Sequence, residues 1–194
     1  ERPVERNEID YKKQLNRDRK CKADFIMNTA AIANYGGGVL VFGVDGENLV
    51  GVDDQDLKFY DSAALQGIVQ KTLSPIPKLS CEIVEHENKK FPFVRIASIV
   101  NAPILITRDF QDDQGKHLLR PGDVYIRQNT QTIKVHTDAQ VRHLLEIVIN
   151  NEVKKRLRVI SPMFSSVEQK IINAVPLVES LAYEQAKERV GIQE

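Results

Sequence analysis

The sequence predicts an α+β fold in which a mixed, mostly antiparallel sheet is flanked by helices and followed by a helical extension. Three observations lead to this class. Short apolar runs with strand periodicity dominate the first two thirds of the chain, amphipathic helical patterns interrupt them, and only helical patterns follow residue 137. We therefore expect a domain at residues 1–136 and a helical extension at residues 137–194.

The first expected element is a strand. Residues 9–12 alternate apolar and polar side chains, which is the periodicity of a half-buried strand. The pattern predicts that Ile9 and Tyr11 face the core. It places Asp10 and Lys12 together on the outward face.

A helix, a run of glycines and a second strand are expected next. Apolar residues at helical spacing predict a helix over residues 21–35, and the glycines at 36–38 end it. Residues 39–44 are apolar on both faces, as in a central strand. The pair at 45–46, Asp-Gly, predicts a tight turn, after which residues 50–52 return antiparallel.

Another helix and several strands complete the predicted domain. Apolar spacing predicts a helix over residues 53–73, which the proline-rich residues 74–77 end. Strand-like runs follow at residues 79–84, 91–100, 103–106 and 124–127. Thr137 opens a capping box before a long amphipathic helix, Pro162 breaks that pattern, and another helix is expected from Ser165.

Composition excludes several classes of protein. The 27 basic and 27 acidic residues cancel, which excludes a uniformly basic, histone-like protein. Cys21 and Cys81 lie 60 residues apart without a CxxC partner, so neither a disulfide framework nor a zinc knuckle is expected. No apolar run is long enough for a membrane span and the first residues lack a signal-peptide core, so we expect a cytoplasmic protein that is part of a longer chain.

Two common catalytic patterns are not supported. The run Gly36–Gly38 suggests a phosphate-binding loop, but such a loop follows a strand and precedes a helix, whereas here the order is helix, glycines, strand. This order favours a helix end with close backbone packing over a nucleotide cradle. The four histidines lack metal-ligand spacing, and no serine lies in a GxSxG motif.

Three carboxylates are the strongest chemical lead. Glu5, Asp10 and Asp45 lie near the ends of the first two predicted strands, and Lys12 shares a strand face with Asp10. Many nucleases hold Mg²⁺ or Mn²⁺ with carboxylates from neighbouring strands, beside a lysine that supports negative charge. Other interpretations stay open. Asp45 can be a turn residue before Gly46. Glu5 and Asp10 are five residues apart, which places them on opposite faces of a regular strand, so they can be separate solvated charges.

Four motifs occur in a fixed order. They are Glu5 with Asp10-Tyr11-Lys12, the helix exit at residues 30–38, the aliphatic strand that leads to Asp45, and Gly122-Asp123-Val124-Tyr125-Ile126-Arg127. Together they resemble the Schlafen-type AlbA-like domain family, which shows a Glu-x4-Glu-Phe-Lys opening, an Ala-Asn-x-x-Gly-Gly helix exit, a Gly-Val-Asp segment and a late Val-Tyr-x-Arg segment. The resemblance covers roughly residues 5–135.

The resemblance implies a nucleic-acid-binding α+β domain. In bacteria such domains stand at the head of regulators, and in animals they occur in Schlafen ribonucleases, where three carboxylates form a metal-dependent site that cuts structured RNA. Carried over position by position, these carboxylates are Glu5, Asp10 and Asp45. Asp10 is one methylene shorter than the family glutamate, the Schlafen zinc ligands have no counterpart, and the motif set occurs once where the animal nucleases have two lobes.

A cluster of basic residues predicts contact with a phosphate backbone. Six cations fall within eleven residues, against the single Asp18: Lys12, Lys13, Arg17, Arg19, Lys20 and Lys22. A solvated loop would explain the same cluster. Arg127, in the last family motif, is the best candidate for a phosphate ligand outside it.

Two classes of function follow. The first is a nuclease that depends on Mg²⁺ or Mn²⁺, with Glu5, Asp10 and Asp45 as ligands, Lys12 as a catalytic cation, and RNA preferred to DNA. The second is a binding or assembly module that delivers a separate effector domain or partner protein. In both cases we expect a homo-oligomer. An isolated helical extension would expose its apolar stripes, so it should pack on a second protomer or a following domain, and a symmetric partner would complete the binding surface of a chain with one lobe.

Overall fold

The computed structural model describes residues 7–99 and 103–157. The chain divides into two units, Glu1–Glu152 and Val153–Glu194, and the fold described below belongs to the first. That unit extends beyond the expected boundary at residue 136 and includes the beginning of the last described helix. Among the described residues, no helix is long and apolar enough to cross a membrane.

A four-stranded sheet forms the centre of the domain, with the order β1-β2-β7-β6. Its strands are β1 (Ile9–Lys12), β2 (Gly38–Phe42), β7 (Lys89–Ile96) and β6 (Leu79–His86). β1 runs parallel to β2, and the other two pairs are antiparallel. Because parallel neighbours need a crossover, helix α1 (Arg19–Tyr35) connects β1 to β2. This sheet confirms the predicted mixed, mostly antiparallel α+β class.

The helix predicted over residues 53–73 is shorter and divided. A 3₁₀ turn, η1 (Leu57–Tyr60), precedes helix α2 (Ser62–Gln70). The division falls at Asp61, whose side chain accepts hydrogen bonds from the backbone N–H groups of Ala63 and Ala64, both at 3.0 Å. An aspartate that caps a new helix cannot also continue the preceding one, and this explains the difference from the prediction.

Short strand pairs and a final helix complete the described part of the chain. The pairs are β3 (Val44–Asp45) with β4 (Asn48–Leu49), β5 (Leu73–Ser74) with β8 (Leu105–Ile106), β9 (Phe110–Gln111) with β10 (His117–Leu119), and β11 (Tyr125–Gln128) with β12 (Gln131–Lys134). The final helix begins at residue 138. Its capping box is formed as predicted, because the Gln140 N–H donates to Thr137 Oγ1 at 3.3 Å and the Thr137 N–H donates to Gln140 Oε1 at 3.1 Å. The helix expected from Ser165 lies outside the described residues.

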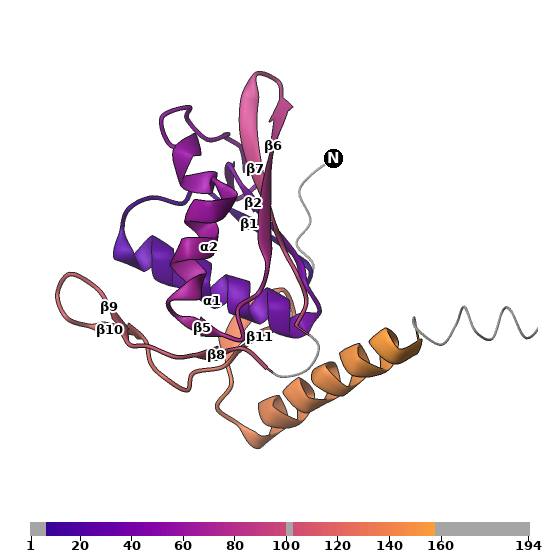
Figure 1. The fold of residues 1–194 in the computed structure, drawn as a ribbon. Helices are drawn as coiled ribbons and strands as arrows, with labels where there is room; N and C mark the ends of the chain where they lie inside the picture. The colour runs from indigo at the N-terminus through magenta and orange to yellow at the C-terminus, as the bar shows by residue number, and fades with distance from the viewer. Residues whose placement is uncertain (1–6, 100–102, 158–194) are drawn as a thin grey trace, which may run out of the picture. The chain divides into compact units, whose positions relative to one another are not determined.

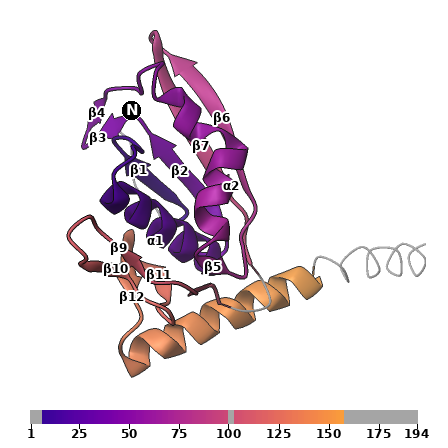
Figure 2. The same ribbon diagram turned by 60° about the vertical axis from the view of Figure 1, so that its left-hand side comes forward.

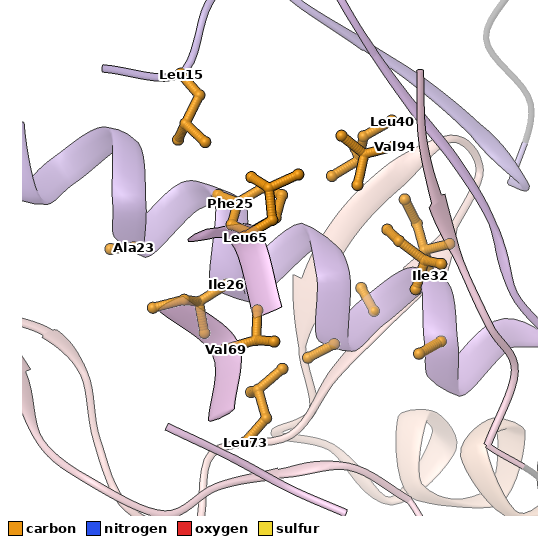
Figure 3. Packing of buried hydrophobic residues seen from close by; sticks show 14 of the residues in the cluster. Leu15, Ala23, Phe25, Ile26, Ile32, Leu40, Leu65, Val69, Leu73 and Val94 are labelled. Carbon is orange, nitrogen blue, oxygen red and sulfur yellow. The ribbon is translucent and has the colours of Figure 1, made fainter. Parts of the chain in front are cut away.

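Both α1 and α2 pack on one face of the sheet (Figure 1, Figure 2). The main core lies between these helices and the strands, as Figure 3 shows for Phe25, Ile32, Leu40, Leu65 and Val94. The opposite face of the sheet carries a smaller cluster of Val41, Val44 and Phe91, against which other apolar side chains pack. The two faces differ because successive residues of a strand point to opposite sides.

The orientation predicted for β1 is wrong. Asp10, expected to face outward, is only 2% exposed, whereas Ile9 and Tyr11 pack with the smaller cluster on the sheet face away from α1. The cause is the register of β1. Asp10 lies beside Leu40 of β2, which is fully buried under α1, and neighbouring residues of paired strands share a face. Asp10 and Lys12 do share a face, but that face is the one the helices cover.

The glycine run ends α1 and brings β1 close to β2. The N–H groups of Gly36 and Gly37 both donate to the Ile32 carbonyl oxygen, at 3.2 and 2.9 Å, and Gly36 has φ 141°. A Cβ at Gly38 would overlap the backbone carbonyl oxygen of Glu8. These contacts agree with a helix end and close backbone packing, the interpretation that the order of elements favours.

Replacing Gly38 by alanine should lower the free energy of unfolding by about 2–3 kcal/mol, because the new methyl group displaces a backbone segment. The Glu8 carbonyl that it meets accepts the Val39 N–H at 2.8 Å, so the start of the β1–β2 pairing is disturbed. Urea unfolding measures the change. Gly67→Ala in α2 is the matched control, since its added Cβ meets no atom within 4 Å apart from its chain neighbours and the backbone of its own helix. The control should be neutral or more stable by up to about 1 kcal/mol, and equal destabilisation by both variants would contradict the explanation.

Candidate functional site

Asp10 is held in the interior by two cations. Its Oδ2 lies 2.9 Å from the Lys12 ammonium and 3.6 Å from Nη1 of Arg127. The carboxylate is 3% exposed and the Arg127 side chain is 1% exposed, whereas Lys12 reaches solvent with 37% of its side chain. The Asp10–Lys12 pair therefore connects a buried negative charge to the surface.

Arg127 belongs to this buried network and not to the exposed basic surface. From β11 its Nη1 donates to Thr132 Oγ1 of β12 at 3.0 Å, and the Thr132 hydroxyl donates to Asn28 Oδ1 of α1 at 2.6 Å. The sequence proposed Arg127 as a phosphate ligand, but a guanidinium that is 1% exposed does not reach a nucleic-acid backbone in this conformation. The network instead ties the β11–β12 hairpin to α1 and β1. Asn28 and Thr132 carried no motif that would have identified them.

Asp45 is exposed, at the end of β3. Its Oδ2 lies 2.8 Å from the Lys13 ammonium, and 52% of its side chain is exposed. Gly46 follows with φ +60° and opens the turn between β3 and β4, so the structure forms the tight turn that the sequence predicted. Asp10 and Asp45 are thus each paired with one of two consecutive lysines. Glu5 lies outside the described residues.

The described residues do not fit a bound Mg²⁺ or Mn²⁺ in this arrangement. Within residues 7–99 and 103–157, no three His, Cys, Asp or Glu side chains are grouped so that they could hold a metal ion. A divalent ion is held by several oxygen ligands together. Both described carboxylates of the predicted set have a lysine within 3 Å, which supplies the positive charge locally.

The N-terminal cationic cluster, defined as Lys12, Lys13, Arg17, Arg19, Lys20 and Lys22, lies between β1 and the first turn of α1. Arg19 is fixed there: its Nη1 donates to the Gln111 carbonyl oxygen at 2.9 Å and its Nε lies 3.3 Å from Asp113 Oδ1. The Arg17 guanidinium lies 5.7 Å from the centre of the Phe59 ring. Within the described part of the chain, Lys20 and Lys22 form no ion pair within 4 Å. Burial raises the pKa of Asp24, and the nearby charge of Lys20 opposes this effect.

A groove of about 480 Å³ adjoins this cluster. Lys22 lines it together with two cations from distant parts of the chain, Lys71 after α2 and Arg108 before β9. Neither Lys71 nor Arg108 belongs to a basic run, so no local pattern in the sequence identifies them, and only the tertiary fold brings them to Lys22.

The two thiols do not support cysteine nucleophile chemistry. Burial raises the pKa of Cys81 to about 11, and the nearby Asp61 carboxylate adds to this increase. Burial, followed by the charges of Asp18 and Asp24, also raises the pKa of Cys21. Because the thiolate is the reactive form, both side chains are protonated and weakly reactive at neutral pH.

Comparison with solved structures gives a limited likeness. The chain is similar to the DIP2311 protein from Corynebacterium diphtheriae, with 14% sequence identity and a TM-score of 0.44. The matched region covers 66% of this chain and 22% of that one, so this chain spans less than a quarter of the solved relative. Comparison with proteins of curated function finds no match.

Comparison with family models identifies the domain. The model described as "Schlafen, AlbA_2" matches residues 5–136, almost the same segment as the four ordered motifs. The match includes β1, the glycine exit of α1, the strand that leads to Asp45, and β11 with Arg127. It covers more than half of the chain and confirms the resemblance seen in the sequence. The chain therefore belongs to the Schlafen AlbA_2 family.

Proposed function

We propose that this domain binds nucleic acid through the phosphate backbone, along the N-terminal cationic cluster. The observation that carries the proposal is the concentration of exposed cations at the start of α1, in a chain whose net charge is zero. Family membership implies a nucleic-acid-related function and supports the same conclusion. Clustered lysines and arginines bind phosphates by charge and by release of counterions, without reading base sequence.

The contacts within the cluster support a surface of fixed shape. Arg19 is anchored to the β9–β10 hairpin by Gln111 and Asp113, and the Arg17 guanidinium is placed near the Phe59 ring. Lys20 and Lys22 stand one and three residues after the start of α1 and supply exposed or half-exposed charge. A phosphate backbone can therefore meet positions that are largely set before binding. Because the chain carries one lobe, we further propose that a second copy extends this surface and that RNA is preferred to DNA.

The test is the salt dependence of binding. A fluorescein-labelled RNA and a DNA of the same sequence are titrated with the protein, and anisotropy gives the affinity at about 50 and 200 mM salt. Several phosphate contacts predict an affinity that falls by about 10-fold or more across this interval. An affinity that is flat in salt would refute backbone binding, and equal affinity for both nucleic acids would refute only the preference for RNA.

A second candidate function is metal-dependent cleavage of the bound nucleic acid at Glu5, Asp10 and Asp45. The observation in its favour is that Asp10 and Asp45 are held by the consecutive residues Lys12 and Lys13, so both carboxylates are tied to the same end of β1. Lys12 is placed to meet a phosphate, because its ammonium group lies beside Asp10 and reaches solvent. The two described carboxylates do not form a metal site by themselves, so this function needs a rearrangement or further ligands.

Asp45→Asn should remove Mn²⁺-dependent cleavage of RNA, because it replaces one of the three proposed carboxylate ligands by an amide. The fold should be nearly unaffected, because the Lys13–Asp45 pair is exposed and such pairs contribute less than about 1 kcal/mol. Gel analysis of RNA incubated with Mn²⁺ or EDTA measures the cleavage, and Asp10→Glu, which restores the family side chain, should retain or increase it. Asp54→Asn is the control, since Asp54 also forms an exposed pair with a lysine, Lys90. If the wild-type protein cuts neither RNA nor DNA with Mn²⁺, the cleavage function is refuted and the domain acts as a binding module.

A further inference from the structure

The groove that Lys22 shares with Lys71 and Arg108 has the composition of a nucleotide site. Its volume of about 480 Å³ lies within the range of small-ligand pockets and is far too small for a duplex. Its apolar surface is formed by Ile68 of α2 and by Phe110, whose ring is partly exposed and packs against the main core. Cations and an aromatic ring therefore line the same hollow.

The walls of the groove are held together by hydrogen bonds. Thr107 donates to the Thr72 carbonyl oxygen twice, from its N–H at 2.8 Å and from its hydroxyl at 3.1 Å. These bonds join the backbone next to Lys71 to the backbone next to Arg108. Arg19 of α1 donates to the Gln111 carbonyl oxygen, next to Phe110. This bond joins α1, which carries Lys22, to the β9–β10 hairpin. Figure 1 shows the start of α1, the end of α2 and the β9–β10 hairpin as neighbours.

The electrostatics of the groove favour an anion. Three cations line it, and within residues 7–99 and 103–157 none of them forms an ion pair with a carboxylate. The one acidic lining residue, Asp109, is engaged elsewhere, because its Oδ1 lies 2.6 Å from His117 Nδ1 and its Oδ2 accepts from Gln111 at 2.7 Å. The hydrogen bond from His117 lowers the pKa of Asp109. The three cations outnumber the single carboxylate of the lining, and a bound phosphate would offset the remaining positive charge.

We propose that this groove binds one phosphodiester of a single-stranded nucleic acid, with the neighbouring unpaired base against Phe110. The inference rests on the proposed function, because Lys22 belongs both to the groove and to the N-terminal cationic cluster. The base is unpaired because a duplex keeps its bases stacked inside, where a ring that lines a groove of this size does not reach them. The cluster then supplies general affinity, and the groove selects single-stranded segments.

The test compares a single strand with a duplex of the same sequence. Lys71→Glu/Arg108→Glu should weaken binding of a single-stranded 12-nucleotide RNA by about 10-fold or more, and binding of the duplex by clearly less. Phe110→Leu, which keeps an apolar side chain, should weaken only single-strand binding, by about 5-fold, as expected for a lost stacking contact. Lys78→Glu/Lys89→Glu makes the same charge change at two exposed residues outside the groove and should leave the preference for single strands unchanged.

The outcomes separate this inference from the proposed function. If the wild type binds in a salt-dependent way and Lys71→Glu/Arg108→Glu binds equally well, the proposal for the groove is refuted and the proposal for the cationic cluster stands. An equal loss for single strand and duplex would also overturn the proposal for the groove, because the groove residues would then act only through net charge. Wild-type protein that binds neither nucleic acid would overturn both. Thermal unfolding of each variant checks that the fold is intact, and Lys71 and Arg108 are exposed, so their replacement should not disturb it.

Discussion

Replacing Arg17, Lys20 and Lys22 together by glutamate should lower the affinity for RNA by about 100-fold or more at low salt. Each replacement changes the local charge by two units and removes a phosphate contact, so the slope of affinity against salt should also become shallower by about one unit per lost contact. Arg19 is kept, because it anchors the β9–β10 hairpin. Fluorescence anisotropy at several salt concentrations measures both quantities.

The control variant makes the same change of net charge at three exposed lysines outside the cluster. Lys78, Lys89 and Lys154 are exposed lysines outside the N-terminal cationic cluster, and their joint replacement by glutamate should have a much smaller effect. If both triple variants lose affinity equally, the protein responds to net charge alone and no defined surface exists. An unchanged affinity in the cluster variant would refute the proposed function.

Replacing Arg127 by methionine should lower the free energy of unfolding by about 3 kcal/mol, which corresponds to about 100-fold in the unfolding equilibrium. Methionine keeps much of the volume but removes the charge beside Asp10, which is 2% exposed, and the hydrogen bond to Thr132. The loss should lie at the lower end of the range for broken buried ion pairs, because Lys12 remains 2.9 Å from the carboxylate. Urea unfolding measures it.

A double variant separates the ion pair from simple packing. Asp10→Asn/Arg127→Met removes both charges, so it should be more stable than the sum of the two single changes predicts, by about 1–2 kcal/mol. Arg142→Met is the matched control. Arg142 pairs with Asp138 on the helix surface, where its side chain is 75% exposed, and its loss should cost less than about 0.5 kcal/mol. Strict additivity in the double variant would show that Arg127 does not stabilise Asp10.

The buried network also changes how the family motifs are understood in this chain. The first and last motifs, which contain Asp10 and Arg127, are far apart in sequence but meet within 3.6 Å in the interior. In the structure these two residues join β1 to the β11–β12 hairpin. Lys12 at the end of β1 and Lys13 directly after it reach the solvent. Asp10 and Arg127, which belong to the family motifs, therefore lie in the interior next to Lys12 of the surface proposed to bind nucleic acid.

Elements whose signals are local could be predicted from the sequence. The apolar spacing of α1, its glycine exit, the apolar strand β2, the Asp45-Gly46 turn and the Thr137 capping box each depend on residues within a few positions of one another. Backbone geometry and nearest-neighbour hydrogen bonds decide such features before the chain collapses. The family also followed from the sequence, because the four motifs occur in order and need no contact to be recognised.

Packing between distant segments determines which face of β1 is buried and which cations lie close together. Alternation assigns Ile9 and Asp10 to opposite faces but does not say which face the helices cover, and the pairing of Asp10 beside Leu40 settled this. In the same way, Lys22, Lys71 and Arg108 come from three segments that share no local pattern, and they line one groove because the backbone at Thr72 pairs with that at Thr107. Periodicity acts over a few residues, whereas burial and charge convergence depend on packing between segments distant in sequence.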